Sequence, residues 1–171
     1  MKKTFLFIMA LSMTISSFGQ NKGETTWTNN FSVSLEALST YKQHDIRELG
    51  ARAEIGYEVI PNLTLFARYE NSIGIYKGSD ARTHFSNNAL GGGFEYKFAK
   101  INNTGHVGLK LAMLGNVGSN DWKKTIYDAN VTWKMRDGLS PSLSLGFRQE
   151  KSSTLGIPDM NVVYGSIGIC F

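Results

Sequence analysis

The sequence is poor in several features that define common classes of protein. Of its 171 residues, one is cysteine, three are proline and only 19% are charged. A single cysteine cannot form an intramolecular disulfide, so the chain is not a disulfide-stabilised scaffold. The formal net charge is +4, and two of these positive charges, Lys2 and Lys3, lie at the extreme N-terminus. The excess that remains is too small to indicate binding to nucleic acid.

The first residues have the layout of a secretory signal peptide. Two lysines precede a mainly apolar stretch at residues 4–15, and the small residues Ser17 and Gly19 suit a cleavage after position 19. A short membrane anchor is the alternative, but the apolar stretch is shorter than the about 20 residues that a spanning helix needs. We therefore predict a signal peptide at 1–19 and one mature domain at 20–171.

Beyond residue 19, no stretch approaches the about 18 consecutive apolar residues that indicate a transmembrane helix. Eight segments instead alternate apolar and polar residues with the period of two that is typical of β-strands. They are 31–38, 49–59, 63–70, 90–98, 107–113, 127–136, 143–150 and 163–171. Each is about as long as a tilted strand that crosses a bilayer, so the pattern predicts a barrel of eight strands.

The charged residues within these segments all share the polar face, and the apolar face carries none. They are Glu36, Arg52, Glu54, Glu58, Arg68, Glu70, Glu95, Lys97, Lys110, Asp128, Lys134, Arg136, Arg148 and Glu150. The interior of an eight-stranded barrel is just wide enough to be filled by side chains. Because acidic and basic residues are equally numerous, we expect a closed network of ion pairs inside the barrel rather than a diffusion pore. A proton or ion path is the alternative.

The connections between the segments alternate in length. Long connections are expected at residues 38–49, 71–89, 115–126 and 151–162, with shorter ones between them. Outer-membrane barrels combine short periplasmic turns with longer external loops, so both termini are predicted to be periplasmic. Aromatic residues near the ends of the apolar faces fit the two interfacial girdles of such barrels. A soluble secreted barrel or sandwich, with the apolar face as its core, is the competing fold.

The last segment ends on an aromatic residue that follows apolar residues at alternate positions. It resembles the closing strand of bacterial outer-membrane proteins, and the whole mature pattern resembles the small eight-stranded barrels of the OmpA/OmpX type. The resemblance implies an all-β fold, an eight-stranded antiparallel up-and-down transmembrane β-barrel in the outer membrane of a Gram-negative cell. It also implies that Val163, Ile167, Ile169 and Phe171 form the signal read by the barrel-assembly machinery.

One short element suggests catalysis. His84 and Ser86 are two residues apart, so in a strand they share a face, and a hydrogen bond between them would activate the hydroxyl. With Asn87 they resemble the His-x-Ser-Asn element of outer-membrane lipid A deacylases, which is found near the end of those chains. Here the element precedes the fourth segment, and the nearby Glu95 has the opposite parity. Our interpretation is a polar external loop with an incidental histidine.

Other candidate sites are weaker. Three scattered histidines without cysteines or carboxylates at ligand spacing predict no metal site, and no cofactor is expected. Residues 122–124 (Trp-Lys-Lys) are predicted to form a solvated loop, with contact to lipopolysaccharide phosphates as the alternative. We expect a non-enzymatic, monomeric barrel with a structural or surface-interaction role carried by its external loops. Its partners would be membrane lipid, lipopolysaccharide and the assembly machinery; a lipid A hydrolase and a soluble periplasmic lipid-binding barrel are the alternatives.

Overall fold

The structure is a computed structural model that describes residues 30–77, 82–101, 105–135 and 140–171. The predicted signal peptide, the predicted interior residue Arg136 and the turn expected beside it lie outside these residues. No helix in the described part of the chain is long and apolar enough to cross a membrane.

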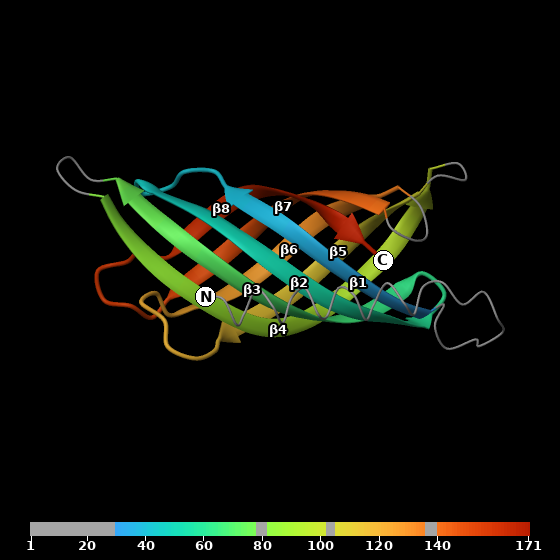
Figure 1. The fold of residues 1–171 in the computed structure, drawn as a ribbon, viewed down its shortest axis with the longest axis horizontal. Coiled ribbons are helices and arrows are strands. Elements are labelled where there is room, and N and C mark those ends of the chain that lie inside the picture. Colours follow the sequence, from blue (N-terminus) through green and yellow to red (C-terminus); the bar gives the residue numbers. More distant parts are fainter. Residues whose placement is uncertain (1–29, 78–81, 102–104, 136–139) are drawn as a thin grey trace, which may run out of the picture.

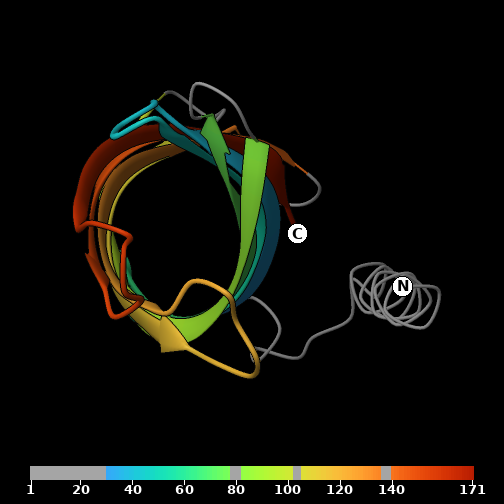
Figure 2. The ribbon, with the colours of Figure 1, turned by 90° about the vertical axis from the view of Figure 1, so that its left-hand side faces the viewer.

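Eight strands form one closed antiparallel barrel, in which each strand pairs with its neighbours in the sequence and β1 pairs with β8 (Figures 1 and 2). They are β1 (Phe31–Thr40), β2 (Ile46–Ile60), β3 (Leu63–Lys77), β4 (Arg82–Lys100), β5 (His106–Asn116), β6 (Lys124–Lys134), β7 (Ser140–Ser152) and β8 (Met160–Cys170). Closure removes the free edges that an open sheet would present. The predicted all-β fold of eight antiparallel strands is confirmed.

Alternation of side chains along the strands gives the barrel an apolar outer wall and a polar interior. In β2, for example, Ile55 and Tyr57 are 54% and 38% exposed, whereas Arg52 and Glu54 are buried. Exposed large hydrophobic side chains occur on all eight strands, and buried charged or hydroxyl groups line the inside. A soluble barrel with an apolar core requires the reverse arrangement, so the competing fold is not the one observed.

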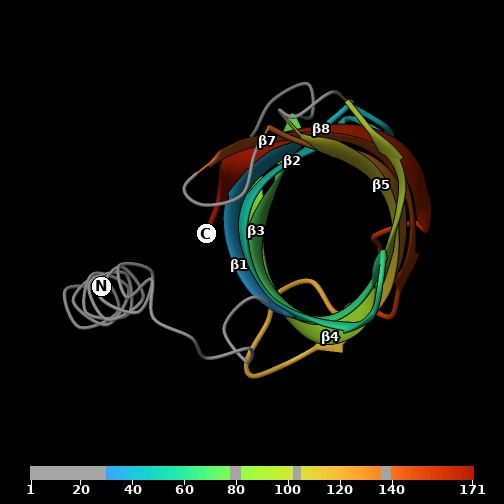
Figure 3. The ribbon, with the colours of Figure 1, turned by 90° about the vertical axis from the view of Figure 1, so that its right-hand side faces the viewer.

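The two ends of the chain that forms the barrel lie side by side at one opening of the barrel. The main-chain N–H of Phe171 donates to the carbonyl of Val33 at 2.8 Å, and the start of β1 lies beside the end of β8 (Figure 3). We call this end the terminal end and the opposite one the loop end. The turn at Pro61 and Asn62 joins β2 to β3 at the terminal end, with Asn62 in the left-handed region at φ 73°. Asparagine tolerates this conformation well, which suits so short a turn.

The main difference from the sequence prediction lies at the loop end. β3 and β4 pair as far as Lys77 opposite Arg82, so most of the expected connection at 71–89 is a continuous hairpin (Figure 1). The other connections at this end are residues 41–45, 117–123 and 153–159. The prediction of four long loops is therefore wrong.

The reason is that the outward side chains change from apolar to polar while the backbone remains a paired β-strand. Along β4 the outward side chains are apolar up to Leu90 and become polar at Asn88, Ser86 and His84. The ladder of main-chain hydrogen bonds continues through these positions, because it does not depend on the polarity of the side chains. The apolar alternation ends before the strand does.

β4 approaches β5 too closely for side chains at two positions. A Cβ added at Gly91 would overlap the carbonyl of Met113, and one added at Gly93 would overlap the carbonyl of Leu111. Glycine allows such a close approach between backbones. The run of glycines in β4 is thus required by the contact between two strands and is not a phosphate loop.

Candidate functional site in the barrel interior

Arg148 links opposite walls of the barrel. Its two terminal nitrogens donate to the two carboxylate oxygens of Glu70 at 2.7 Å each, and its Nε donates to Asp128 at 2.7 Å. All three side chains are buried. Glu70 is on β3 and Arg148 on β7, four strands apart in the ring of eight, so this bidentate pair crosses the lumen. Paired N–H groups on a carboxylate are among the strongest protein hydrogen bonds.

A second arginine, Arg52 on β2, also donates several hydrogen bonds inside the barrel. Arg52 donates to Glu36 at 2.5 Å, to the hydroxyl of Tyr164 at 3.0 Å and to Ser166 at 2.9 Å. The Ser166 hydroxyl in turn donates to Glu36 at 2.7 Å. Tyr164 also lies under the guanidinium of Arg148, 4.4 Å from its ring centroid, and its hydroxyl donates to Asp128 at 3.0 Å. This tyrosine joins the two arginine clusters.

Glu54 completes the middle of the lumen. It accepts hydrogen bonds from Arg68 at 2.7 Å and from Lys110 at 2.5 Å. A terminal nitrogen of Arg68 lies 3.1 Å from Asp128. The central network therefore holds four carboxylates and four cationic groups among the described residues: Glu36, Glu54, Glu70, Asp128, Arg52, Arg68, Lys110 and Arg148. Its formal charges cancel.

Two further pairs lie toward the terminal end. Glu95 accepts from Lys134 at 2.8 Å and lies 3.3 Å from His106. Lys97 donates to Glu58, and both are partly exposed. A polar hollow of about 360 Å³, lined in part by Glu58, Lys97 and His106, opens here. These pairs are balanced too, one carboxylate to each lysine.

The loop-end cluster, made of Glu48, Trp122, Lys124 and Glu150, is different. The ammonium of Lys124 is 2.6 Å from Glu48 and 2.9 Å from Glu150, and it stacks on the Trp122 ring at 3.8 Å. All four residues are at most 1% exposed. Two carboxylates thus share one cation. One oxygen of Glu48 and both of Glu150 accept no hydrogen bond within the described residues.

Trp122 also caps the lumen at this end. It packs with Ile46, Met160 and Val162, and its carbonyl accepts from Asn87 at 2.8 Å. The loop that carries it, residues 117–123, lies at the rim beside β4 (Figure 2). The prediction of a solvated loop is wrong for Trp122 and Lys124. Both side chains point inward, because positions 122 and 124 continue the series of alternate inward-facing positions of β6. Only Lys123, of opposite parity, is exposed.

The catalytic-looking residues His84 and Ser86 lie on β4 and not in a loop, so that part of the interpretation is wrong as well. The Ser86 hydroxyl donates to Asp121 at 2.7 Å, and the Ser86 N–H donates to the same oxygen at 3.2 Å. These hydrogen bonds lower the pKa of Asp121. No hydrogen bond joins His84 to Ser86 among the described residues. The hydroxyl therefore donates to a carboxylate, and the pair of nucleophile and imidazole base is not assembled.

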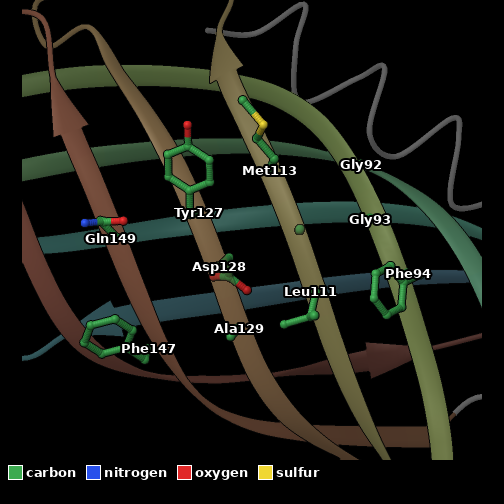
Figure 4. A pocket seen from close by; sticks show the side chains of 11 residues that line it. Gly92, Gly93, Phe94, Leu111, Met113, Tyr127, Asp128, Ala129, Phe147 and Gln149 are labelled. Atoms are coloured by element: carbon green, nitrogen blue, oxygen red, sulfur yellow. The ribbon is translucent and has the colours of Figure 1, made fainter.

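The outer wall carries an apolar groove of about 500 Å³ across β4 to β7 (Figure 4). Its lining combines the small residues Gly92 and Ala129 with larger side chains that stand around them. The larger ones include Phe94, Leu111, Met113, Tyr127 and Phe147, and the polar members are Gln149 and Asp128. The groove lies on the outer wall, and Asp128 is the residue that it shares with the charge network.

Eleven of the charged residues predicted to face inward are buried in the lumen: Glu36, Arg52, Glu54, Arg68, Glu70, Glu95, Lys110, Asp128, Lys134, Arg148 and Glu150. Sequence reasoning missed Glu48 and Lys124. Each lies just before a predicted segment, at a position where the alternation of that segment, if extended, places the side chain inside the barrel. Val163, Ile167 and Ile169 are exposed on the outer wall, and Phe171 follows β8. Over the described residues, no group of three or more ligand-type side chains could hold a metal ion.

Solved structures with a similar fold include the outer-membrane protein Ail of Yersinia pestis, determined in a phospholipid bilayer nanodisc, with a TM-score of 0.49 and 12% identity over 83% of this chain and 99% of that one. Neisserial surface protein A matches with a TM-score of 0.49 and 18% identity, over 82% of this chain and 94% of that one. The likeness concerns the fold alone. No protein-family model and no curated protein matches the sequence.

Proposed function

We propose that this chain is an integral outer-membrane β-barrel with a sealed lumen, and that it acts structurally or in surface interactions rather than as a pore or an enzyme. The observation that carries the proposal is the separation of charge. Charged side chains fill the inside of the barrel, and exposed hydrophobic side chains surround the outside on every strand. Such a wall is unfavourable in water, by about 25 cal/mol for each Å² of apolar surface, and is favourable in lipid.

Aromatic side chains support placement in a bilayer. Phe31 and Tyr57 pack at 4.9 Å between ring centroids near the terminal end, where Tyr96 and Phe98 are also exposed. Tyr69 and Tyr127 are exposed nearer the loop end. Aromatic rings concentrate where a barrel meets the two interfaces of a membrane. The strands between these two levels would span the hydrocarbon.

The basic residues at the loop end support an orientation. Arg47, Lys123 and Lys151 have outward parity there, beyond the apolar belt, and all three are exposed. Anionic phosphates of lipopolysaccharide lie at the external surface of the outer membrane, where such cations are favourable. In this orientation the loop end is external and both termini are periplasmic.

The surface available for interactions is smaller than the sequence suggested. It consists of the β3–β4 hairpin and the connections at 41–45, 117–123 and 153–159. Tyr41 and Leu155 present exposed apolar side chains there, 78% and 102% exposed. Apolar side chains beyond the bilayer are suited to contact with another surface.

The test expresses the chain with its signal in a Gram-negative host. We expect detergent-extracted membrane protein that migrates differently with and without boiling, and no stable conductance steps in planar bilayers, with a large porin as the positive control. Soluble material without a mobility shift would contradict the membrane placement, and regular conductance steps would contradict the sealed lumen. Mass spectra of lipid A from the same cells should match those of cells that express Ser86→Ala; an acyl chain lost only with the unsubstituted protein would support a hydrolase instead.

A further inference from the structure

We propose that the groove on the outer wall binds an acyl chain of a phosphorylated lipid, and that Lys123 and Lys151 hold its phosphate. The inference rests on the proposed function, because it needs the outer wall to face lipid and the loop end to face the headgroups. The inference adds a specific lipid-binding site to an outer wall that the proposed function treats only as a nonspecific contact with the bilayer.

Strand register explains why a groove exists at this place. Two outward rows cross the four strands: Gly92, Met113, Tyr127 and Gln149 in one, and Phe94, Leu111, Ala129 and Phe147 in the next. Each row contains one small residue among large ones. Gly92 has no side chain and Ala129 has one methyl group, so the wall is low where its neighbours are high (Figure 4). The volume of about 500 Å³ lies in the range of about 300–1,000 Å³ that is usual for small-molecule sites.

The chemistry of the groove fits hydrocarbon. Aliphatic and aromatic side chains dominate its lining, and Gln149 is the outward polar side chain, located at the edge nearest the loop end. An occupant of the groove therefore finds few hydrogen-bonding partners along most of its length. An alkyl chain needs none, and it gains from every apolar contact.

The cations lie where the headgroup of such a lipid would lie. The outward row after Tyr127 and Gln149, one step toward the loop end, contains Thr125 and Lys151. The ammonium of Lys151 is 5.8 Å from the centroid of the Tyr127 ring, so it already leans over the end of the groove.

Lys123 lies beside this row. Its N–H donates to Thr154 at 2.7 Å and its carbonyl accepts from Ser153 at 2.7 Å, which fixes its backbone next to β7. Neither Lys123 nor Lys151 has a carboxylate partner in the described part of the chain. Two ammonium groups that pair with no carboxylate of the described residues lie at the headgroup end, with an apolar groove below them, and they are complementary to a phosphate that carries acyl chains.

The experiment uses full-length protein that has first been shown to be folded by its heat-dependent migration. Lipid A, dephosphorylated lipid A and phosphatidylcholine are each added to the protein in detergent, and the bound lipid is counted by native mass spectrometry. We expect lipid A to be retained in preference to the other two. Ala129→Leu fills the groove and should lower retention by at least about tenfold, since an acyl chain loses its apolar contacts. Ala53→Leu, the same change on the outer wall of β2, where no groove residue lies next to it, should leave it unchanged.

The cations are tested separately. Replacing Lys123 and Lys151 together with glutamine should lower retention of lipid A by at least about tenfold, the range expected for charged hydrogen bonds, without changing retention of dephosphorylated lipid A. Arg47→Gln is the control for loss of a loop-end charge. Equal retention by the two leucine variants, equal retention of all three lipids, or a second copy of the chain bound in place of lipid would overturn the inference. A folded barrel that fails in these ways leaves the proposed function intact, whereas soluble protein without a mobility shift contradicts both.

Discussion

The centre and the loop end of the lumen bury charge in two different ways. In the described residues, the central network has four carboxylates and four cations, and the loop-end cluster has two carboxylates and one cation. Within the part of the chain that the structure describes, three oxygens of Glu48 and Glu150 have no hydrogen-bond partner, and so do one oxygen of Glu36 and two nitrogens of Arg68 in the central network. Both regions are buried to the same degree. They differ in the balance between carboxylates and cations.

The difference has a physical consequence. A buried charge is tolerated when it is paired and hydrogen-bonded, and it is costly when it is left over. The central network therefore stabilises the barrel only as a complete set, because removing one member leaves its partners as buried charges without a counter-charge. By formal count, the loop-end cluster has one carboxyl group more than it has cations, and its apolar cap lies beside it. We infer that the loop end is the less stable end of the lumen.

Breaking the central network should have the largest effect. Arg148→Met removes the partner of Glu70 and Asp128 and leaves two buried carboxylates without their main cation. We expect the free energy of unfolding, measured by urea titration in detergent micelles, to fall by about 3–5 kcal/mol. The control is Lys42→Met, which removes the exposed pair of Lys42 and Asp45 and should cost about 0–1 kcal/mol. Equal losses in the two variants would contradict the comparison.

Opening the cap should have a smaller and more local effect. Trp122→Leu keeps part of the apolar contact with Ile46 and Met160 but leaves a cavity above Lys124. We expect a loss of about 1–3 kcal/mol. Amide hydrogen exchange should rise in residues 117–123 and remain unchanged around Arg148. Faster exchange along the whole barrel would show that the two regions unfold as one.

The fold could be read from the sequence wherever alternation was strict. Apolar residues at every second position in eight segments gave the number of strands, and the uncharged face gave the side that meets lipid. The ends of the strands could not be obtained in this way. At Asn71 and Asn88 the outward side chains are polar, and Tyr69 and Asn71 both donate hydrogen bonds to the side-chain oxygen of Asn88 on the outer surface. A strand that leaves the membrane keeps its backbone pairing but loses its apolar signal.

The sequence predicted which charged side chains face the interior, but it did not predict which of them form ion pairs with one another. Parity indicates that Arg148 points inward, yet it does not indicate that Glu70, from the opposite wall, is its partner. That pairing depends on the stagger of the closed barrel, which relates strands that are not neighbours in the sequence. The burial of Trp122 was missed because this residue lies in a connection, where no alternation is expected. Asp121, the acceptor for Ser86, was missed for the same reason.

The smallest expected effect is the sharpest test of the comparison. Glu150→Gln and Glu70→Gln are the same chemical change at two buried positions of one lumen. At Glu150 the change removes the excess negative charge and leaves Lys124 paired with Glu48, so the free energy of unfolding should stay within about 1 kcal/mol or rise. At Glu70 it takes one of two carboxylates from Arg148, and the loss of charged hydrogen bonds should cost about 1.5–3 kcal/mol. Urea titrations of both variants at one neutral pH measure the difference directly. If Glu150→Gln is as damaging as Glu70→Gln, the loop-end carboxylates are compensated as fully as the central ones, because a group left in excess can be neutralised without loss while a fully paired one cannot.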